Sequence, residues 1–152
     1  MIVEFTLNGA PVSVRVMSPV SLLDVLRDQI GLAGSKSACQ QGECGSCSVV
    51  LDGDVVCSCL VMASDAEGSE VTTVEGVSGS GELNRVQEAM NQAGAVQCGF
   101  CTPGIVVAAT DLFERVEKPD AAEIKEALAG NICRCTGYGA IIRALQSAAE
   151  TT

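Results

Sequence analysis

The 152-residue sequence contains no histidine and no tryptophan, and its aromatic side chains are limited to three Phe and one Tyr. The absence of histidine excludes a Rieske-type centre, in which two histidines bind one iron. Basic residues are also few: nine Lys and Arg stand against 19 Asp and Glu, giving a formal net charge of −10. This charge argues against a protein that binds nucleic acid through its phosphates.

Long hydrophobic runs are absent as well, so we expect no membrane-spanning segment. The stretch from Met1 to Leu7 alternates like a strand and lacks the basic start and the twin arginine of export signals. We therefore expect a cytoplasmic protein, in which the nine cysteines serve as metal ligands rather than as disulfides.

The spacing of these cysteines is the most informative feature of the chain. Cys39, Cys44 and Cys47 follow a C-x4-C-x2-C pattern, which with a distant fourth cysteine is typical of a plant-type [2Fe–2S] ferredoxin. Gly42 and Gly45 lie inside this loop, where glycine permits positive φ and lets backbone N–H groups face the cluster sulfurs. We therefore expect both glycines to help bind the cofactor.

The fourth ligand of this first group must come from further along the chain. Cys57 and Cys59 both follow the next expected strand, and alternation puts them on the same face of the sheet. Periodicity therefore leaves the choice between them open.

A second group of cysteines occupies the C-terminal half and consists of Cys98, Cys101, Cys133 and Cys135. Two groups of four ligands predict two one-electron carriers in one chain. For the second group a zinc site remains an alternative, because CxxC pairs are typical of zinc knuckles. Phe100 and Tyr138 lie beside expected ligands, and we expect them mainly to pack against neighbouring side chains.

The N-terminal half alternates with the period of β-strands and contains one helical stretch. The helix is expected to begin at Ser21, which resembles the start of a capping box, and to end at Gly31. The expected strands are Ile2–Leu7 and Val12–Val16 with an Asn8–Gly9 turn, Ser48–Leu51, Val55–Val56 after Asp52–Gly53, and a final edge strand at Val71–Val74. This order is that of a β-grasp, ubiquitin-like ferredoxin.

A Gly/Ser linker at 76–82 is expected to separate a β-grasp domain at 1–75 from a helical domain at 83–152. Beyond it the apolar period changes to 3.6, which predicts four helices. They are centred on Val86–Ala93, on Pro103–Val116 with Thr102 as N-cap, on Ala121–Ala129 and on Ile141–Ala148. We expect a four-helix bundle with a metal site between its two cysteine loops, so the fold class is α+β.

Several motifs resemble those of a known family. They are the Cys39–Cys47 loop followed by Asp52-Gly53 and a Val-Val pair, the run Gln97-Cys-Gly-Phe-Cys-Thr-Pro-Gly104, and the run Asn131-Ile-Cys-Arg-Cys-Thr-Gly-Tyr138. Together they resemble the iron–sulfur subunits of the molybdenum hydroxylases, the family of xanthine dehydrogenase, aldehyde oxidoreductase and CO dehydrogenase. The resemblance covers nearly the whole chain and implies two [2Fe–2S] clusters, with Cys59 as the fourth ligand of the first and Cys57 as the spare cysteine.

The resemblance also implies a division of labour among subunits. Electrons would pass from a molybdenum–pterin cofactor on a large subunit, through both clusters, to FAD on a medium subunit, in a dimer of heterotrimers. Gln97 and Cys135 would approach the pterin, and Cys135 would both bind iron and relay electrons. The chain would have no substrate site of its own, and the substrate would be a purine, N-heterocycle, aldehyde, aromatic thioester or CO.

Two other functions follow from the residues alone. One is a binding or structural module with two zinc sites. The other is a free-standing ferredoxin that moves between enzymes, although such a shuttle needs only the first domain.

Overall fold

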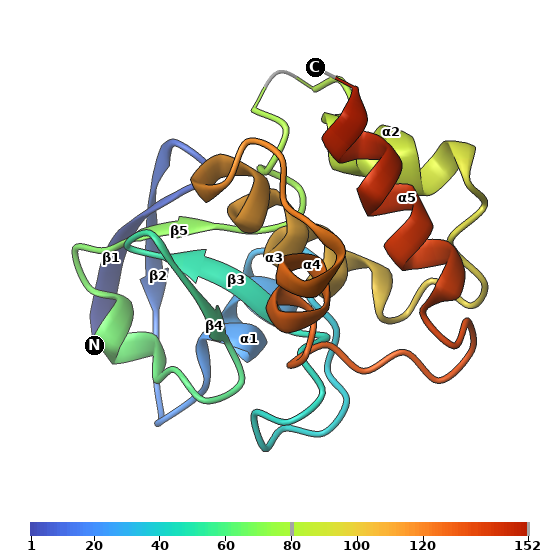
Figure 1. Cartoon of the computed structure of the whole chain (residues 1–152). Helices are drawn as coiled ribbons and strands as arrows, with labels where there is room; N and C mark the ends of the chain where they lie inside the picture. The colour runs from blue at the N-terminus through green and yellow to red at the C-terminus, as the bar shows by residue number, and fades with distance from the viewer. Residues whose placement is uncertain (80, 152) are drawn as a thin grey trace.

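The computed structural model describes residues 1–79 and 81–151 and places a five-stranded sheet beside a group of helices (Figure 1). The strands are β1 (Ile2–Leu7), β2 (Ala10–Arg15), β3 (Ser48–Leu51), β4 (Asp54–Cys57) and β5 (Glu70–Thr72). The helical elements are α1 (Leu22–Asp24), the π-helix η1 (Val25–Gln29), the 3₁₀-helix η2 (Ala63–Ala66), α2 (Arg85–Gln92), α3 (Thr102–Arg115), α4 (Ala121–Ala127) and α5 (Gly139–Glu150). The expected combination of a ferredoxin-like sheet with helices is confirmed.

Two tight turns form the hairpins of the sheet. Asn8 and Gly9, at φ 51° and 81°, connect β1 to β2, and Asp52 and Gly53, at φ 50° and 90°, connect β3 to β4. Two successive residues with positive φ define the type I′ turn, and Asn-Gly and Asp-Gly favour it because they tolerate the left-handed region. Both turns were predicted, and both are confirmed.

The order of the strands across the sheet is β2-β1-β5-β3-β4. Strand β5 pairs in parallel with β1 and antiparallel with β3, and Val71 on it is fully buried. The expectation that Val71–Val74 forms an edge strand is therefore wrong. The cause is a pairing between distant parts of the chain, which the local sequence of β5 does not encode.

The helical segment α1–η1 covers one face of this sheet. Its start is fixed by Ser21, whose side chain accepts a hydrogen bond from the Asp24 N–H at 3.1 Å, as the sequence predicts. Leu22, Val25 and Leu26 are fully buried against the apolar side chains of the strands. Burying a side chain of this size contributes about 1.5–3 kcal/mol, so this face anchors the loop that follows.

The other half of the molecule contains α2, α3, α4 and α5 around a second core. Ile105, Ile141 and Leu145 are fully buried in it, as their helical spacing predicts. Helix α3 begins one residue earlier than expected, with Cys101 rather than Thr102 as its N-cap. None of the helices in the described part of the chain is both long and apolar enough to cross a bilayer.

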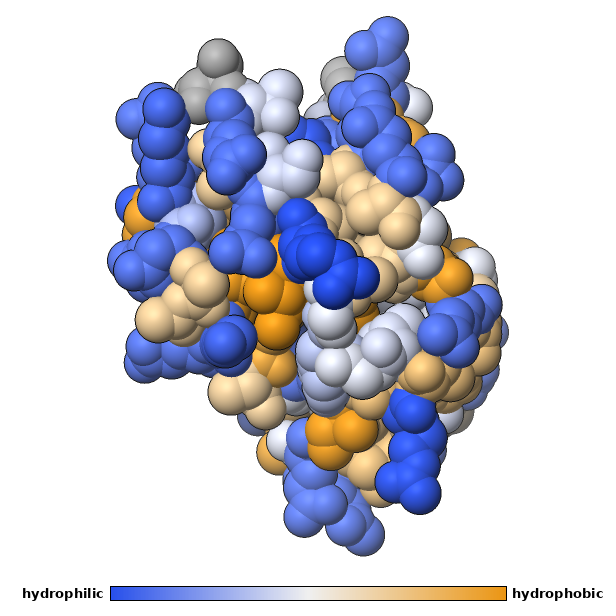
Figure 2. Space-filling view, turned by 45° about the vertical axis from the view of Figure 1, so that its right-hand side comes forward, coloured by the Kyte–Doolittle hydropathy of each residue, from blue (hydrophilic) through white to orange (hydrophobic). Residues whose placement is uncertain are grey.

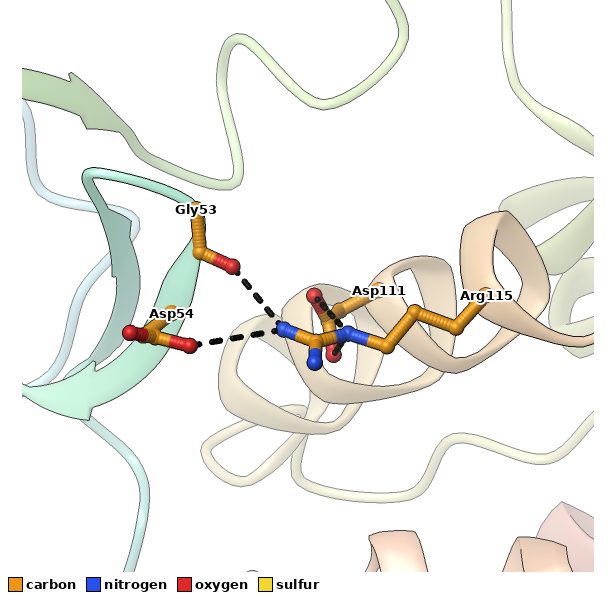
Figure 3. A network of polar contacts seen from close by, with 4 residues as sticks. All are labelled: Gly53, Asp54, Asp111 and Arg115. Carbon is orange, nitrogen blue, oxygen red and sulfur yellow. Dashed lines mark hydrogen bonds and ion pairs between the residues drawn. The ribbon is translucent and has the colours of Figure 1, made fainter.

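Helix α3 connects the two halves by packing against β3 and β4. At its end Arg115 donates a hydrogen bond of 2.9 Å to the Gly53 carbonyl and pairs with Asp54 at 3.6 Å and with Asp111 at 3.1 Å (Figure 3). Exposed ion pairs of this kind contribute at most about 1 kcal/mol, so the apolar packing of α3 matters more. The expected linker at 76–82 includes residue 80, which lies outside the described residues.

Candidate metal centres

The first cysteine loop leaves η1 and returns to the sheet at β3. Gln40, Gly42 and Gly45 adopt positive φ of 53°, 74° and 70°. These turns direct backbone amides at the Cys39 sulfur: the Gln41 N–H lies 3.4 Å from it, and the amides of Cys44 and Glu43 also face it. These hydrogen bonds lower the pKa of Cys39 to about 6, and the one from the Gln41 N–H has the largest effect. Backbone N–H groups therefore face the Cys39 sulfur, as the glycines of this loop led us to expect.

This loop and the end of β4 bring five cysteines together: Cys39, Cys44, Cys47, Cys57 and Cys59. The Cys47 sulfur lies within hydrogen-bonding reach of both Cys57 and Cys59. Burial is the main reason that the pKa of Cys57 rises to about 11 and that of Cys59 to about 12. The structure thus brings both candidates for the fourth ligand to the same group.

The second group forms where two loops meet. The Cys98 side chain lies next to that of Cys135, and the Cys101 side chain lies next to that of Cys133. The amide of Phe100 lies 3.5 Å from the Cys98 sulfur and lowers its pKa, whereas burial raises the pKa of Cys101 to about 12. All four expected ligands are therefore neighbours.

The two pairs differ in their access to solvent. Cys98 and Cys135 are exposed, whereas Cys101 is half-buried and Cys133 is buried. Burial opposes the ionisation of Cys133, but hydrogen bonds from Thr136, Cys101 and Cys135 together outweigh it and lower the pKa to about 7. This second group therefore has one side at the surface and one side in the core.

Exposed residues surround the open side of the second group. Gln97, which the family resemblance implies would approach a pterin, is exposed beside Cys98. Val96, Phe100 and Ile132 are apolar yet between 42% and 53% exposed. Figure 2 shows hydrophobic residues exposed in patches between hydrophilic ones on the face that it presents. Exposed apolar side chains are typical of surfaces that bind another protein where they form one contiguous patch.

The two cysteine loops touch each other directly. The Ile132 N–H donates to the Cys44 carbonyl at 2.9 Å, and the buried Asn131 side chain donates to the Gly45 carbonyl at 3.1 Å. Gly45 also lies against the start of α3, where a methyl group on Gly104 would overlap the Gly45 carbonyl. The close approach of the loops requires glycine at both positions.

The donor set fits the expected cofactor. Both groups consist of thiols, which bind iron as thiolates and release protons when they do so. Within residues 1–79 and 81–151, no three His, Cys, Asp or Glu side chains close on a single point as ligands of one metal ion. A [2Fe–2S] cluster instead distributes four thiolates over two irons.

Tyr138 has a larger role than the packing that the sequence suggests. Its hydroxyl accepts a hydrogen bond from the Cys133 N–H at 2.9 Å and donates one to the Asn131 carbonyl at 3.0 Å. Tyr138 itself has a φ of 67°. The hydroxyl thereby closes the loop that carries Cys133 and Cys135. Only the position of the tyrosine, three residues after the last cysteine, hints at this role in the sequence.

We expect Tyr138→Phe to weaken this loop, because it leaves the Cys133 N–H and the Asn131 carbonyl without their partner. An unsatisfied buried group costs about 1–3 kcal/mol, and the free energy of unfolding should fall by that amount in denaturant titrations. Ser37→Ala, which removes an exposed hydroxyl beside the other loop, should change it by less than about 0.5 kcal/mol. Equal stability of the two variants would contradict the role given to Tyr138.

Comparison with known proteins gives matches over both cysteine groups. Residues 5–76 match the 2Fe-2S iron-sulfur cluster binding domain, and residues 73–146 match the [2Fe-2S] binding domain. The chain is 44% identical to the xanthine dehydrogenase iron-sulfur-binding subunit of Escherichia coli O157:H7, over 98% of this chain and 94% of that protein. It is also 42% identical to the aldehyde oxidoreductase of Megalodesulfovibrio gigas, over 95% of this chain but 16% of that longer protein.

A solved structure extends the likeness to three dimensions. Quinoline 2-oxidoreductase from Pseudomonas putida 86 contains a chain that superposes with a TM-score of 0.93 at 41% identity, covering 99% of this chain and 94% of that chain. The similarity therefore includes the sheet, the helices and the loops that carry the two groups of cysteines.

Proposed function

The chain belongs to the iron–sulfur subunits of the molybdenum hydroxylase family, and from this premise we propose that it relays electrons from a molybdenum–pterin subunit to a flavin subunit. Members of this family are the small [2Fe–2S] subunits of multi-subunit molybdenum oxidoreductases, which makes this chain part of an enzyme. The proposal concerns the residues that hold the clusters, the order of the carriers and the partners.

We assign the β-grasp cluster to Cys39, Cys44, Cys47 and Cys59, and the helical cluster to Cys98, Cys101, Cys133 and Cys135. When bound, each [2Fe–2S] cluster supplies a site that takes up and gives back one electron. The chain supplies the thiolates and directs amide groups at Cys39 and Cys98, which stabilises negative charge at those sulfurs.

The main support for electron transfer between the two clusters is the hydrogen bond between the two cysteine loops. Cys44 is an assigned ligand on one side, and its carbonyl accepts the Ile132 N–H at 2.9 Å. Ile132 is bonded to Cys133, an assigned ligand on the other side. One hydrogen bond and a few covalent bonds therefore join the two sets of ligands. Such a short connection supports electron transfer within the chain.

The exposed side of each loop supports the order of the carriers. Cys98 and Cys135 are exposed, which suits Cys135 and the neighbouring Gln97 to face the pterin on a molybdenum subunit. At the other loop Gln40, Gln41 and Glu43 are exposed, so we assign the segment from Gln40 to Ser46 to the flavin subunit. Electrons would then arrive at the helical cluster and leave from the β-grasp cluster.

The proposal also includes the domain boundaries and the assembly of the complex. We divide the chain into a β-grasp domain at 1–75, a linker at 76–82 and a helical domain at 83–152. In the helical domain α2, α3, α4 and α5 share one core, which supports a four-helix bundle. We propose a dimer of heterotrimers in the cytoplasm, acting on a purine, N-heterocycle, aldehyde or CO.

Metal analysis tests the cofactor assignment. We expect about four irons and four acid-labile sulfides for each chain purified without oxygen, since eight thiolates hold two [2Fe–2S] clusters. The protein should be red-brown and should elute from gel filtration of a native extract with larger partner chains. A colourless chain with stoichiometric zinc and no sulfide would identify it as a zinc-binding module instead, and elution as a monomer would point to a free-standing ferredoxin.

A further inference from the structure

The end of β4 and the turn after it hold Gly42 in the first cysteine loop. The Cys57 thiol donates a hydrogen bond to the Gly42 carbonyl, with the sulfur 3.6 Å from the oxygen. Cys57 is the last residue of β4 and is paired with Ser48 of β3. Its position is therefore fixed by the sheet, and through the thiol the sheet holds the loop.

Gly42 is held on two further sides by the residues that follow. Its N–H faces the sulfur of Cys59, and the Leu60 side chain lies so close above its Cα that a methyl group there would overlap it. The turn itself is closed by a hydrogen bond of 2.9 Å from the Leu60 N–H to the Cys57 carbonyl. The segment from Cys57 to Leu60 thus contacts Gly42 at its carbonyl, at its N–H and at its Cα.

The direction of the hydrogen bond separates the roles of the two cysteines. A thiolate that binds iron has no proton to donate, and it would face the negative end of the Gly42 carbonyl. Cys59 faces the N–H group of Gly42 instead, an arrangement that a metal-bound sulfur can accept.

We propose that Cys57 is a positioning residue for electron transfer: its thiol holds the Gly42 carbonyl, so that the Gly42 amide stays directed at the sulfur of Cys59 and raises the reduction potential of the β-grasp cluster. The proposal rests on the assignment of Cys59 as a ligand. Hydrogen bonds to cluster sulfurs stabilise the reduced, more negative state, and they are among the factors that set the potential. Loss of the thiol frees the Gly42 carbonyl, loosens the amide and lowers the potential.

The test uses the complete complex with Cys57→Ala and Cys57→Ser. In a potentiometric titration followed by EPR, we expect the ratio of reduced to oxidised β-grasp cluster in Cys57→Ala to fall by about tenfold at a fixed potential, which corresponds to ~59 mV for one electron. Cys57→Ser retains a donor for the carbonyl and should return the potential towards that of the unmodified protein. The helical cluster should keep its potential in both variants.

Val55→Ala is the matched control, because Val55 is a half-buried residue of the same strand that pairs with Val50 and does not contact Gly42. It should leave the potential unchanged. An unaltered potential in Cys57→Ala, or an equal shift in Val55→Ala, would overturn the proposal. Loss of iron from Cys57→Ser would instead show that Cys57 is the ligand, which overturns the assignment of Cys59 while leaving the order of the carriers intact.

Discussion

Gly45→Val should stop electrons from reaching the flavin while substrate still reduces the molybdenum centre. Gly45 has a φ of 70°, and a Cβ there would overlap the Gly130 carbonyl and lie 2.6 Å from the Asn131 side-chain nitrogen. Valine adds two methyl groups to that overlap, so the first loop must move away from the second. The hydrogen bond between Ile132 and Cys44 would break, and the β-grasp cluster would be lost or displaced.

Rapid-mixing spectroscopy of the complete complex separates the steps that this variant affects. We expect molybdenum reduction at the normal rate and flavin reduction slowed by orders of magnitude. Gly53→Val is the matched control: its φ of 90° imposes a similar backbone penalty, but no atom lies within 4 Å of an added Cβ. Left-handed backbone costs a residue with a Cβ about 1–2 kcal/mol, so the control should fold and transfer electrons normally.

Flavin reduction at the normal rate after loss of the β-grasp cluster would show that the proposed order of carriers is wrong. Slow molybdenum reduction in the same variant would point to general damage to the complex. The two results are distinguishable when molybdenum reduction is followed by EPR and flavin reduction by absorption.

The parts of the fold that were predicted correctly depend on neighbouring residues. Asn8-Gly9 and Asp52-Gly53 produce their turns because two successive residues tolerate positive φ, whatever the rest of the chain does. The cap of the first helix follows the same rule: Ser21 accepts a hydrogen bond from the Asp24 N–H, three residues along. Patterns of this range can be read from sequence.

The parts that were missed depend on residues far apart in the chain. Strand β5 lies between β1 and β3 because of a parallel pairing in which Leu7 meets Val71. Similarly, nothing near Gly45 in the sequence indicates that it lies against Gly104 and Asn131. Alternation of side chains specifies which face of a strand is buried, but not which strand lies beside it.

The candidate metal centres were likewise predicted only in part. The spacing of the cysteines was enough to place them in two groups, since each group forms from loops that the sequence delimits. The sequence did not indicate the hydrogen bonds of Tyr138 to Cys133 and Asn131. It also left the choice between Cys57 and Cys59 to the family resemblance, because both side chains belong to the same face.

Replacing Cys59 by serine should cost the chain its β-grasp cluster, whereas the same change at Cys57 should not. In the proposed assignment Cys59 supplies one of the four thiolates, and its sulfur faces the Gly42 amide and Cys47. Cys57 supplies only a hydrogen bond to the Gly42 carbonyl. Serine is nearly isosteric with cysteine at both positions, so the two variants differ in the ligand that is lost rather than in packing.

EPR of the two reduced variants distinguishes the ligand from the spare cysteine, provided that the signals of the two centres are recorded separately. Cys59→Ser should lose or distort the signal of the β-grasp centre, with iron falling from about four to about two per chain where the cluster is lost. Cys57→Ser should keep about four irons and both signals. The signal of the helical centre is the internal control, because its ligands lie on the other pair of loops. The reverse pattern would make Cys57 the fourth ligand, and loss of both signals in either variant would mean that the two loops cannot hold their clusters independently.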